Sequence, residues 1–123
     1  MKIRVYYEDT DLGGIVYHAN YIKYCERARS EHFFTHDMMP GEGDTSSFVV
    51  RTLKADYLAT ATLGDILEVT TEILSTKNSS VTLLQQIFKE GQLIFAMEIV
   101  LVYVVDGKPS RIPKKFKEIF ALI

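Results

Sequence analysis

Residues 19–36, ANYIKYCERARSEHFFTH, decide the fold that we predict for this chain. Apolar and polar side chains in this stretch separate onto opposite sides of a helical wheel, which indicates an amphipathic helix. The apolar side is wide because Ile22 and Phe33 extend it, and such a side is typical of a helix covered by a sheet. The Pro and Gly residues of the loop segment 37–44 then require the helix to end near residues 37–38.

Most of the remaining chain carries strand signals, either alternation of apolar and polar residues or enrichment in β-branched and aromatic residues. The last strand signal is apolar on both faces, which is typical of a central strand covered on both sides. Pro113 precedes a short terminal helix. One early helix followed by strands joined by short turns predicts an α+β fold with an antiparallel sheet packed on the helix. The predicted strands are 2–7, 48–57, 67–73, 81–88 and 93–105.

Length and composition limit the kinds of protein that this chain can be. Its 123 residues are typical of one domain, so we expect a single domain over residues 1–123. A formal net charge of −2 argues against a nucleic-acid partner. No apolar run approaches the roughly 20 residues of a transmembrane segment, and the first residues lack the apolar core of a signal peptide. The single cysteine, Cys25, fits a reducing compartment, so we expect a cytoplasmic protein.

The stretch Tyr7–Tyr21 is the candidate functional region, because it places carboxylates, two glycines and a histidine directly before the helix. Gly13 and Gly14 indicate a loop that can adopt positive φ and approach a ligand closely. A helix that begins near His18 directs its free N–H groups and the positive end of its dipole at this loop. Such donors can bind an oxyanion or polarise a carbonyl, and Asp11 lies on the other side of the glycines.

These residues resemble the hotdog-fold acyl-CoA thioesterases, in particular the branch that holds 4-hydroxybenzoyl-CoA thioesterase and the bacterial YbgC-type enzymes. The motif of that branch is an acidic-Thr-Asp segment, a glycine pair, Val-Tyr-His-x-x-Tyr and Glu-x-Ala-Arg. It is present here in residues 9–11, 13–14, 16–21 and 26–29. The resemblance implies a hotdog fold, a five-stranded antiparallel sheet wrapped around one long central helix. It also implies hydrolysis of acyl-CoA thioesters without a metal or organic cofactor, since coenzyme A is part of the substrate.

The same resemblance implies roles for individual residues. Asp11 occupies the position of the catalytic aspartate, and the backbone N–H of His18 matches the donor that polarises the thioester carbonyl. Tyr7 is a further catalytic candidate, and the family leaves open whether the histidine ring takes part. The resemblance also implies homodimers or homotetramers with active sites between subunits. The substrate-binding candidates are Gly13, Gly14, Tyr17, Lys77 and Asn78, the last two at positions where relatives hold the nucleotide phosphates of coenzyme A.

Each candidate also has a purely structural interpretation. Asp11 can cap the helix or brace the turn, since Asp is favoured in both places. Lys77 and Asn78 can form an ordinary solvated turn. Cys25 lies about two helical turns beyond His18, which raises the alternative of a Cys–His nucleophile, but its place on the apolar side favours a buried structural thiol.

Charged residues near the motif raise two further questions. Glu8, Asp9 and Asp11 are close in sequence, yet they lack the ligand spacing of an EF-hand loop, so no metal is expected. Glu26 and Arg29 are three residues apart on the helix and are expected to form an ion pair. An ionised Asp11 can attack as a nucleophile or hold a water molecule, and the sequence leaves both paths open.

Two rival functions follow from the same fold. One is a non-catalytic module that binds acyl carrier protein or an acyl group, because a fold alone does not establish an activity. The other is a hotdog dehydratase, for which Glu26 is the acidic residue on the central helix. Release of a free thiol, compared with formation of an enoyl product, distinguishes the two enzymes. The sequence does not choose between coenzyme A and acyl carrier protein as the carrier.

Overall fold

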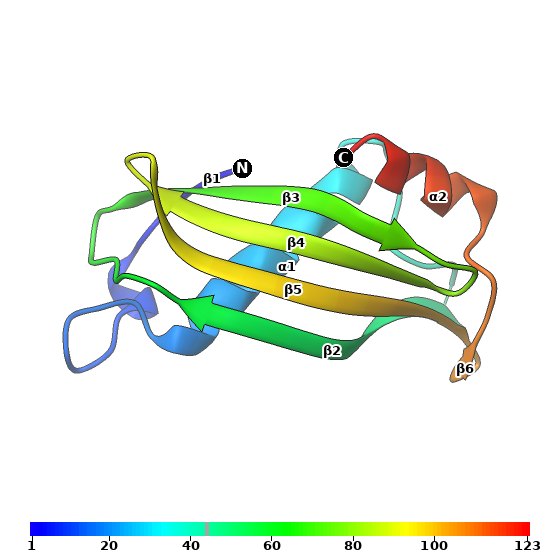
Figure 1. The fold of residues 1–123 in the computed structure, drawn as a ribbon, viewed down its shortest axis with the longest axis horizontal. Helices are drawn as coiled ribbons and strands as arrows, with labels where there is room; N and C mark the ends of the chain where they lie inside the picture. The colour runs from blue at the N-terminus through cyan, green and yellow to red at the C-terminus, as the bar shows by residue number, and fades with distance from the viewer. Residues whose placement is uncertain (44) are drawn as a thin grey trace.

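The structure is a computed structural model that describes residues 1–43 and 45–123. It shows a curved antiparallel sheet with one long helix lying across one face (Figure 1). This arrangement confirms the predicted α+β class and the hotdog architecture. The elements are β1 (Lys2–Arg4), a 3-10 turn η1 (Tyr7–Asp9), α1 (His18–Phe34), β2 (Ser46–Tyr57), β3 (Ile66–Thr76), β4 (Ser80–Lys89), β5 (Gln92–Val105), β6 (Lys108–Pro109) and α2 (Lys114–Ala121).

The order of strands across the sheet is β1-β3-β4-β5-β2, and the two-residue β6 pairs with the end of β5. All pairs are antiparallel. The helix α1 carries the chain from β1 at one edge to β2 at the opposite edge, which is why β2 pairs with β5 instead of β3. Tyr57, the last residue of β2, therefore lies opposite Phe95 near the start of β5. Among the described strands, β2 has a single ladder partner.

The helix α1 begins where predicted, and a hydrogen-bonded C-cap ends it. Asp37 adopts a positive φ of 54°. The N–H of Met38 donates to the carbonyl of Phe33 at 3.0 Å, and the N–H of Asp37 donates to the carbonyl of Phe34 at 3.0 Å. These two bonds form a Schellman motif with Asp in the left-handed position. The helix therefore ends at Phe34, slightly earlier than predicted, and Asp44 of the predicted loop lies outside the described residues.

The C-terminal helix α2 closes one end of the core. Phe116 and Phe120 meet Phe33 of α1 and Phe48 of β2 with ring centroids 5.4 to 5.8 Å apart. Such edge-to-face contacts between aromatic rings stabilise the packing beyond simple burial. No described helix has the length and apolar character needed to cross a membrane.

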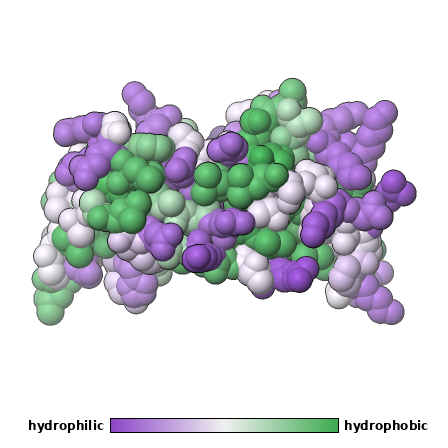
Figure 2. Space-filling model, in the orientation of Figure 1, coloured by the Kyte–Doolittle hydropathy of each residue, from purple (hydrophilic) through white to green (hydrophobic). Residues whose placement is uncertain are grey.

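Two sequence predictions are wrong in detail. The first strand ends at Arg4 instead of residue 7, because the Asp9 carboxylate accepts the N–H of Tyr6 at 2.9 Å and closes the turn η1. The long strand β5 has only one fully buried face. Its outer face carries the exposed Glu98 and the half-buried Val100, and no described element covers it (Figure 2).

Candidate functional site

Backbone hydrogen bonds hold the loop between η1 and α1 at both ends. Thr10 bridges Val16, and the N–H of Val16 donates to the carbonyl of Ala61 at 2.9 Å. The N–H of Tyr17 donates to the carbonyl of Asp9 at 2.9 Å. Gly14, with φ of 80°, supplies the positive φ that the turn requires. The loop therefore presents its side chains from a fixed backbone in front of α1.

Asp11 braces this turn and is also open to solvent. Its Oδ1 accepts the N–H of Gly13 at 2.8 Å, and its carbonyl accepts the N–H of Gly14 at 3.0 Å. A Cβ at position 13 would lie 3.2 Å from Oδ1, so glycine suits this approach. Within the described part of the chain, Oδ2 has no hydrogen-bond partner. Asp11 therefore braces the turn, as one structural interpretation predicted, but it does not cap α1, whose N-cap residue is Tyr17. The brace leaves one carboxylate oxygen without a partner among the described residues.

The charge of Asp11 acts on the first turns of α1. Burial raises the pKa of the Tyr21 phenol, and the nearby negative charge of Asp11 adds a smaller contribution in the same direction. The Tyr21 hydroxyl accepts the N–H of Ala61 at 3.2 Å, and the carbonyl of the same Ala61 accepts the N–H of Val16 in the loop. Val16 of the loop and Tyr21 of α1 thus share Ala61 as a hydrogen-bond partner, which ties the loop to the start of the helix.

His18 is the first residue of α1, as predicted. Its backbone N–H has no hydrogen-bond acceptor among the described residues, as expected for the first turn of a helix. The imidazole is exposed and lies against Tyr17, with ring centroids 4.5 Å apart. A free donor at the positive end of a 17-residue helix can stabilise an oxyanion.

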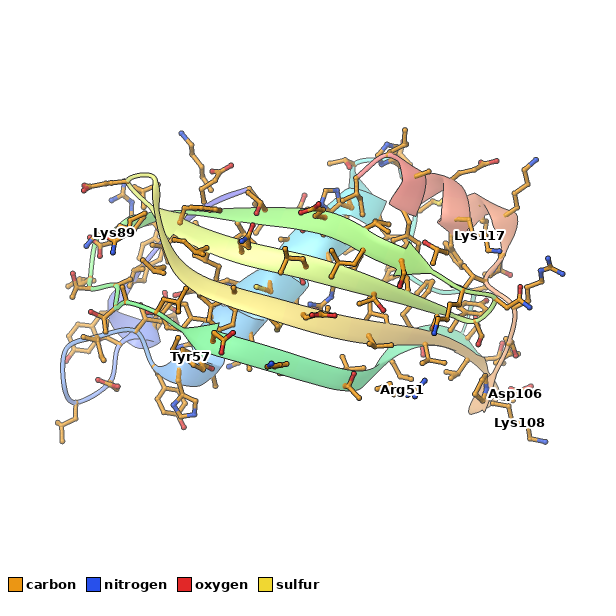
Figure 3. All side chains as sticks on the ribbon, viewed as in Figure 1. Arg51, Tyr57, Lys89, Asp106, Lys108 and Lys117 are labelled. Carbon is orange, nitrogen blue, oxygen red and sulfur yellow. The ribbon has the colours of Figure 1, made fainter. Side chains whose placement is uncertain are left out.

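Tyr57 and Asn20 support this site, and the sequence analysis did not single them out. The Tyr57 hydroxyl donates to the carbonyl of His18 at 2.9 Å, and Figure 3 shows Tyr57 at the end of β2 beside α1. Its ring packs edge-on against Phe95 with centroids 5.1 Å apart. Asn20 Nδ2 donates to the carbonyl of Asp9 at 2.9 Å. No local pattern identifies Tyr57, because 39 residues separate it from His18.

Tyr7 makes no side-chain contact among the described residues that brings it into the site. It is 81% exposed, and its hydrogen bonds are made by its backbone carbonyl. Tyr17 is also exposed but adjoins His18 through its ring. Its role as a wall of the site remains a prediction, as does the catalytic role of Tyr7.

Lys77 and Asn78 form the predicted turn, but at the other end of the sheet from Asp11 (Figure 1). The N–H of Lys77 donates to the carbonyl of Ser80, and the carbonyl of Asn78 accepts the N–H of Ile112 at 2.8 Å. The 11-residue strand β3 separates the two ends by roughly 35 Å. Within one chain these residues do not share a site with Asp11, so a common site requires a second copy.

Cys25 is a buried structural thiol, as the sequence favoured. It is 0% exposed, and burial raises its pKa to about 12, an effect that the charge of Arg29 partly opposes. A thiol that stays protonated at neutral pH is a poor nucleophile. No contact joins it to His18 within the described residues, so the Cys–His interpretation is not supported.

A buried glutamine links α1 to the sheet beside this cysteine. Gln85 is 0% exposed, and its Nε2 donates to the carbonyl of Cys25 at 2.9 Å and to Thr71 Oγ1 at 3.1 Å. Its Oε1 accepts Arg29 Nη1 at 2.8 Å. The predicted ion pair between Glu26 and Arg29 is therefore wrong, because Arg29 points to Gln85 on the sheet. Glu26 Oε1 instead accepts the Ser30 hydroxyl at 3.2 Å.

A cavity of about 210 Å³ lies next to this cluster. Its walls come from the second half of α1, the inner faces of the sheet strands and the end of α2. Glu26 and Val50 are exposed at its lining, so the cavity opens beside the free edge of β2. In residues 1–43 and 45–123, no three His, Cys, Asp or Glu side chains are grouped as metal ligands.

Comparisons with known proteins agree on one family. Residues 13–96 match the model described as Thioesterase superfamily. The chain is 44% identical over 134 aligned positions to "Acyl-CoA thioesterase YbgC" from Helicobacter pylori strain J99, covering 100% of each chain. A probable thioesterase structure from Bartonella henselae is 28% identical with a TM-score of 0.85, covering 92% of this chain and 97% of that chain. A Thermus thermophilus thioesterase complexed with coenzyme A and Zn is 26% identical with a TM-score of 0.82, covering 98% of this chain and 94% of that chain.

Proposed function

The chain belongs to the thioesterase superfamily, and on this premise we propose that it hydrolyses the thioester bond of acyl-coenzyme A. The observation that carries the proposal is that one loop-and-helix segment presents an Asp11 carboxylate oxygen and the His18 N–H, neither of which has a hydrogen-bond partner among the described residues. The name of the Helicobacter pylori relative and the coenzyme A bound in the Thermus thermophilus structure support this choice of substrate.

The geometry suits attack on a polarised carbonyl. The thioester oxygen accepts the His18 N–H, whose position at the helix start stabilises the negative charge that develops there. In one path Asp11 takes a proton from water, the water oxygen bonds to the carbonyl carbon, and the C–S bond breaks. In the other path Asp11 attacks to form a mixed anhydride, which water then hydrolyses. Both paths release a carboxylic acid and a thiolate that takes up a proton.

The reaction as proposed uses no metal or organic cofactor. Water and the side chain of Asp11 supply the atoms that react, and a backbone donor supplies the polarisation. Coenzyme A enters as part of the substrate, with acyl carrier protein as the alternative carrier. A cytoplasmic location also stays a prediction, supported by the single cysteine.

A homodimer or homotetramer with composite sites is part of the proposal. The free edge of β2 exposes apolar side chains, among them Val50 (49%), Leu53 (41%) and Tyr57 (46%). Unprotected edge strands of this kind pair readily with another copy. Antiparallel pairing of β2 with itself brings the Tyr57 end of one copy to the Ser46 end of the other. The α1 start of each subunit then faces its partner.

The decisive experiment replaces Asp11 by Asn and follows thiol release from acyl-CoA. Asn keeps an oxygen for the Gly13 N–H but removes the negative charge, so the fold is expected to survive. The rate should fall at least ~10²-fold, the usual effect of losing an acid, base or nucleophile. The matched control is Glu8→Gln, which removes an exposed neighbouring charge and should leave the rate within about twofold.

The same assay tests the other parts of the proposal. Wild-type activity should be unchanged after treatment with a chelator, and loss with recovery on adding a divalent ion contradicts the metal-free mechanism. Near-normal turnover by folded Asp11→Asn contradicts the role of Asp11. Formation of an enoyl product without thiol release favours the dehydratase, with Glu26 as the residue to test next.

A further inference from the structure

The lining of the cavity beside α1 includes a cation, Arg29, that makes no ion pair among the described residues. Arg29 is half-buried at its lining, and burial lowers the pKa of its guanidinium. Its Nη1 donates to the neutral Gln85, and no ion pair involves Arg29 among the described residues. A partly buried charge without a direct ion-pair partner is costly, and a guanidinium has further N–H donors that suit a carboxylate. A bound carboxylate would supply that partner.

The other titratable groups at the cavity do not neutralise Arg29 directly. The charge of Glu26 partly opposes the lowering of the Arg29 pKa by burial, but Glu26 is exposed at the opening, accepts the Ser30 hydroxyl and makes no ion pair with Arg29 among the described residues. Burial lowers the pKa of His32, which keeps this ring neutral at neutral pH. The cation therefore lies deeper than the anion, and a ligand that passes Glu26 meets Arg29.

Apart from Ser30 and Thr71, the rest of the lining is apolar, and the cavity is of limited size. The volume of about 210 Å³ exceeds the ~150 Å³ of dry apolar cavities that accept benzene, so it suits a short chain or a single ring. A long fatty acyl chain does not match this space. The apolar lining residues are Phe33, Pro40, Phe48, Val50, Leu83, Leu101, Phe120 and Ile123.

Pairing of two β2 strands connects this cavity to the reactive groups. Arg29 lies about 16 Å along α1 from His18 of its own chain, too far for a short acyl group to span. Full antiparallel overlap of two β2 strands instead places Tyr57 of the partner subunit near Ser46, two residues from Phe48 at the cavity wall. The α1 start of the partner subunit then lies at the opening of the cavity.

On these grounds we propose that the cavity binds the acyl end of the substrate and that Arg29 selects acyl groups that end in a carboxylate. The preferred substrates are then short dicarboxylic monothioesters. Arg29 acts on specificity and not on the reacting atoms. This inference rests on the proposed thioesterase function and adds the substrate class.

The test compares glutaryl-CoA with pentanoyl-CoA, which share a five-carbon acyl chain and differ by a terminal carboxylate in place of a methyl group. Wild type should have a kcat/KM at least ~10-fold higher for glutaryl-CoA, the size expected of a charge-assisted hydrogen bond. Arg29→Gln should abolish this preference, mainly by raising KM for glutaryl-CoA. The control Arg27→Gln, an exposed cation on the same helix that does not line the cavity, should keep the preference.

The outcomes separate the two proposals. Equal kcat/KM for both substrates in active wild type overturns the role of Arg29 and leaves the thioesterase function intact. Absence of thiol release from any acyl-CoA overturns the thioesterase function instead. Calorimetric binding of pentanoate and of pentanamide to wild type tests Arg29 without turnover or a variant that fails to fold, because the two share a chain and only pentanoate carries a carboxylate. Tighter binding of pentanoate supports the proposal, and equal or absent binding of both contradicts it.

Discussion

The start and the middle of α1 hold polar groups in opposite ways. At the start, backbone bonds fix Asp11 and His18 on the surface, and one carboxylate oxygen and one N–H stay free among the described residues. In the middle, side-chain bonds of Gln85 tie Cys25 and Arg29 to the sheet in the interior. The same helix thus offers reactive groups at its start and groups bonded to the sheet two to three turns further on.

This difference shows that residue type does not decide reactivity by itself. Cys25 is intrinsically the stronger nucleophile, yet burial keeps it protonated, whereas Asp11 is a weak nucleophile on an exposed, rigid loop. Local hydrogen bonding and solvent access assign the chemistry to the start of the helix. The middle of the helix serves packing. Within the described cavity, the remaining N–H donors of Arg29 are the groups of this part of the helix that can bind a ligand.

The largest expected effect concerns the reactivity of Cys25. In the folded protein at pH 8 a soluble disulfide reagent should label it at least ~10³-fold more slowly than in the unfolded chain. A pKa of about 12 leaves far less thiolate than the ordinary value near 8.5. The chain has one cysteine, so the measured label reports this site alone.

The same pKa fixes the sign of a pH effect on stability. The native thiol stays neutral while the unfolded thiol ionises near pH 8.5, so the contribution of Cys25 is complete below that pH. It declines as the pH rises toward 12. The control Cys25→Ala should show a weaker loss of urea midpoint between pH 7 and pH 10. Rapid labelling of the folded protein with loss of activity contradicts the view that burial makes Cys25 unreactive, and it restores Cys25 as a catalytic candidate.

A second prediction tests the bonds of the buried cluster. Gln85→Leu removes a partner of Arg29 and of the Cys25 carbonyl in a fully buried site, which should lower the free energy of unfolding by about 2 kcal/mol. Gln86→Leu is the matched control, because Gln86 lies on the outer face of β4 and should change stability by no more than about 0.5 kcal/mol. If urea titrations show the same loss of stability for both variants, the hydrogen bonds of Gln85 do not stabilise the middle of the helix.

The sequence predicted these two regions unequally well. Local patterns located the loop, the helix start and the burial of Cys25, because glycines, helix periodicity and apolar spacing act within a few residues. The alternation in residues 81–88 places Gln85 on the same face as Leu83 and Ile87, but its bonds were missed, because Arg29 and the Cys25 carbonyl are 56 and 60 residues away. The ion pair of Glu26 and Arg29 failed for the same reason, because the partner of Arg29 is 56 residues away.

The smallest expected effect lies at the contact between strand and helix start. Tyr57→Phe keeps the ring packing and removes the hydrogen bond to the His18 carbonyl, so the first turn of α1 should lose about 1 kcal/mol of support. If that bond aligns the N–H that polarises the thioester, kcat should fall roughly fivefold while KM stays nearly constant.

Tyr17→Phe is the control for this prediction, because Tyr17 adjoins the same imidazole and its hydroxyl makes no hydrogen bond among the described residues. It should leave kcat within about twofold. A KM change without a kcat change in Tyr57→Phe indicates that Tyr57 contacts the substrate instead of positioning the helix. Unchanged kinetics in both variants show that the backbone bonds of the loop alone fix the start of α1. The start and the middle of the helix would then differ in reactivity only because the start is exposed to solvent.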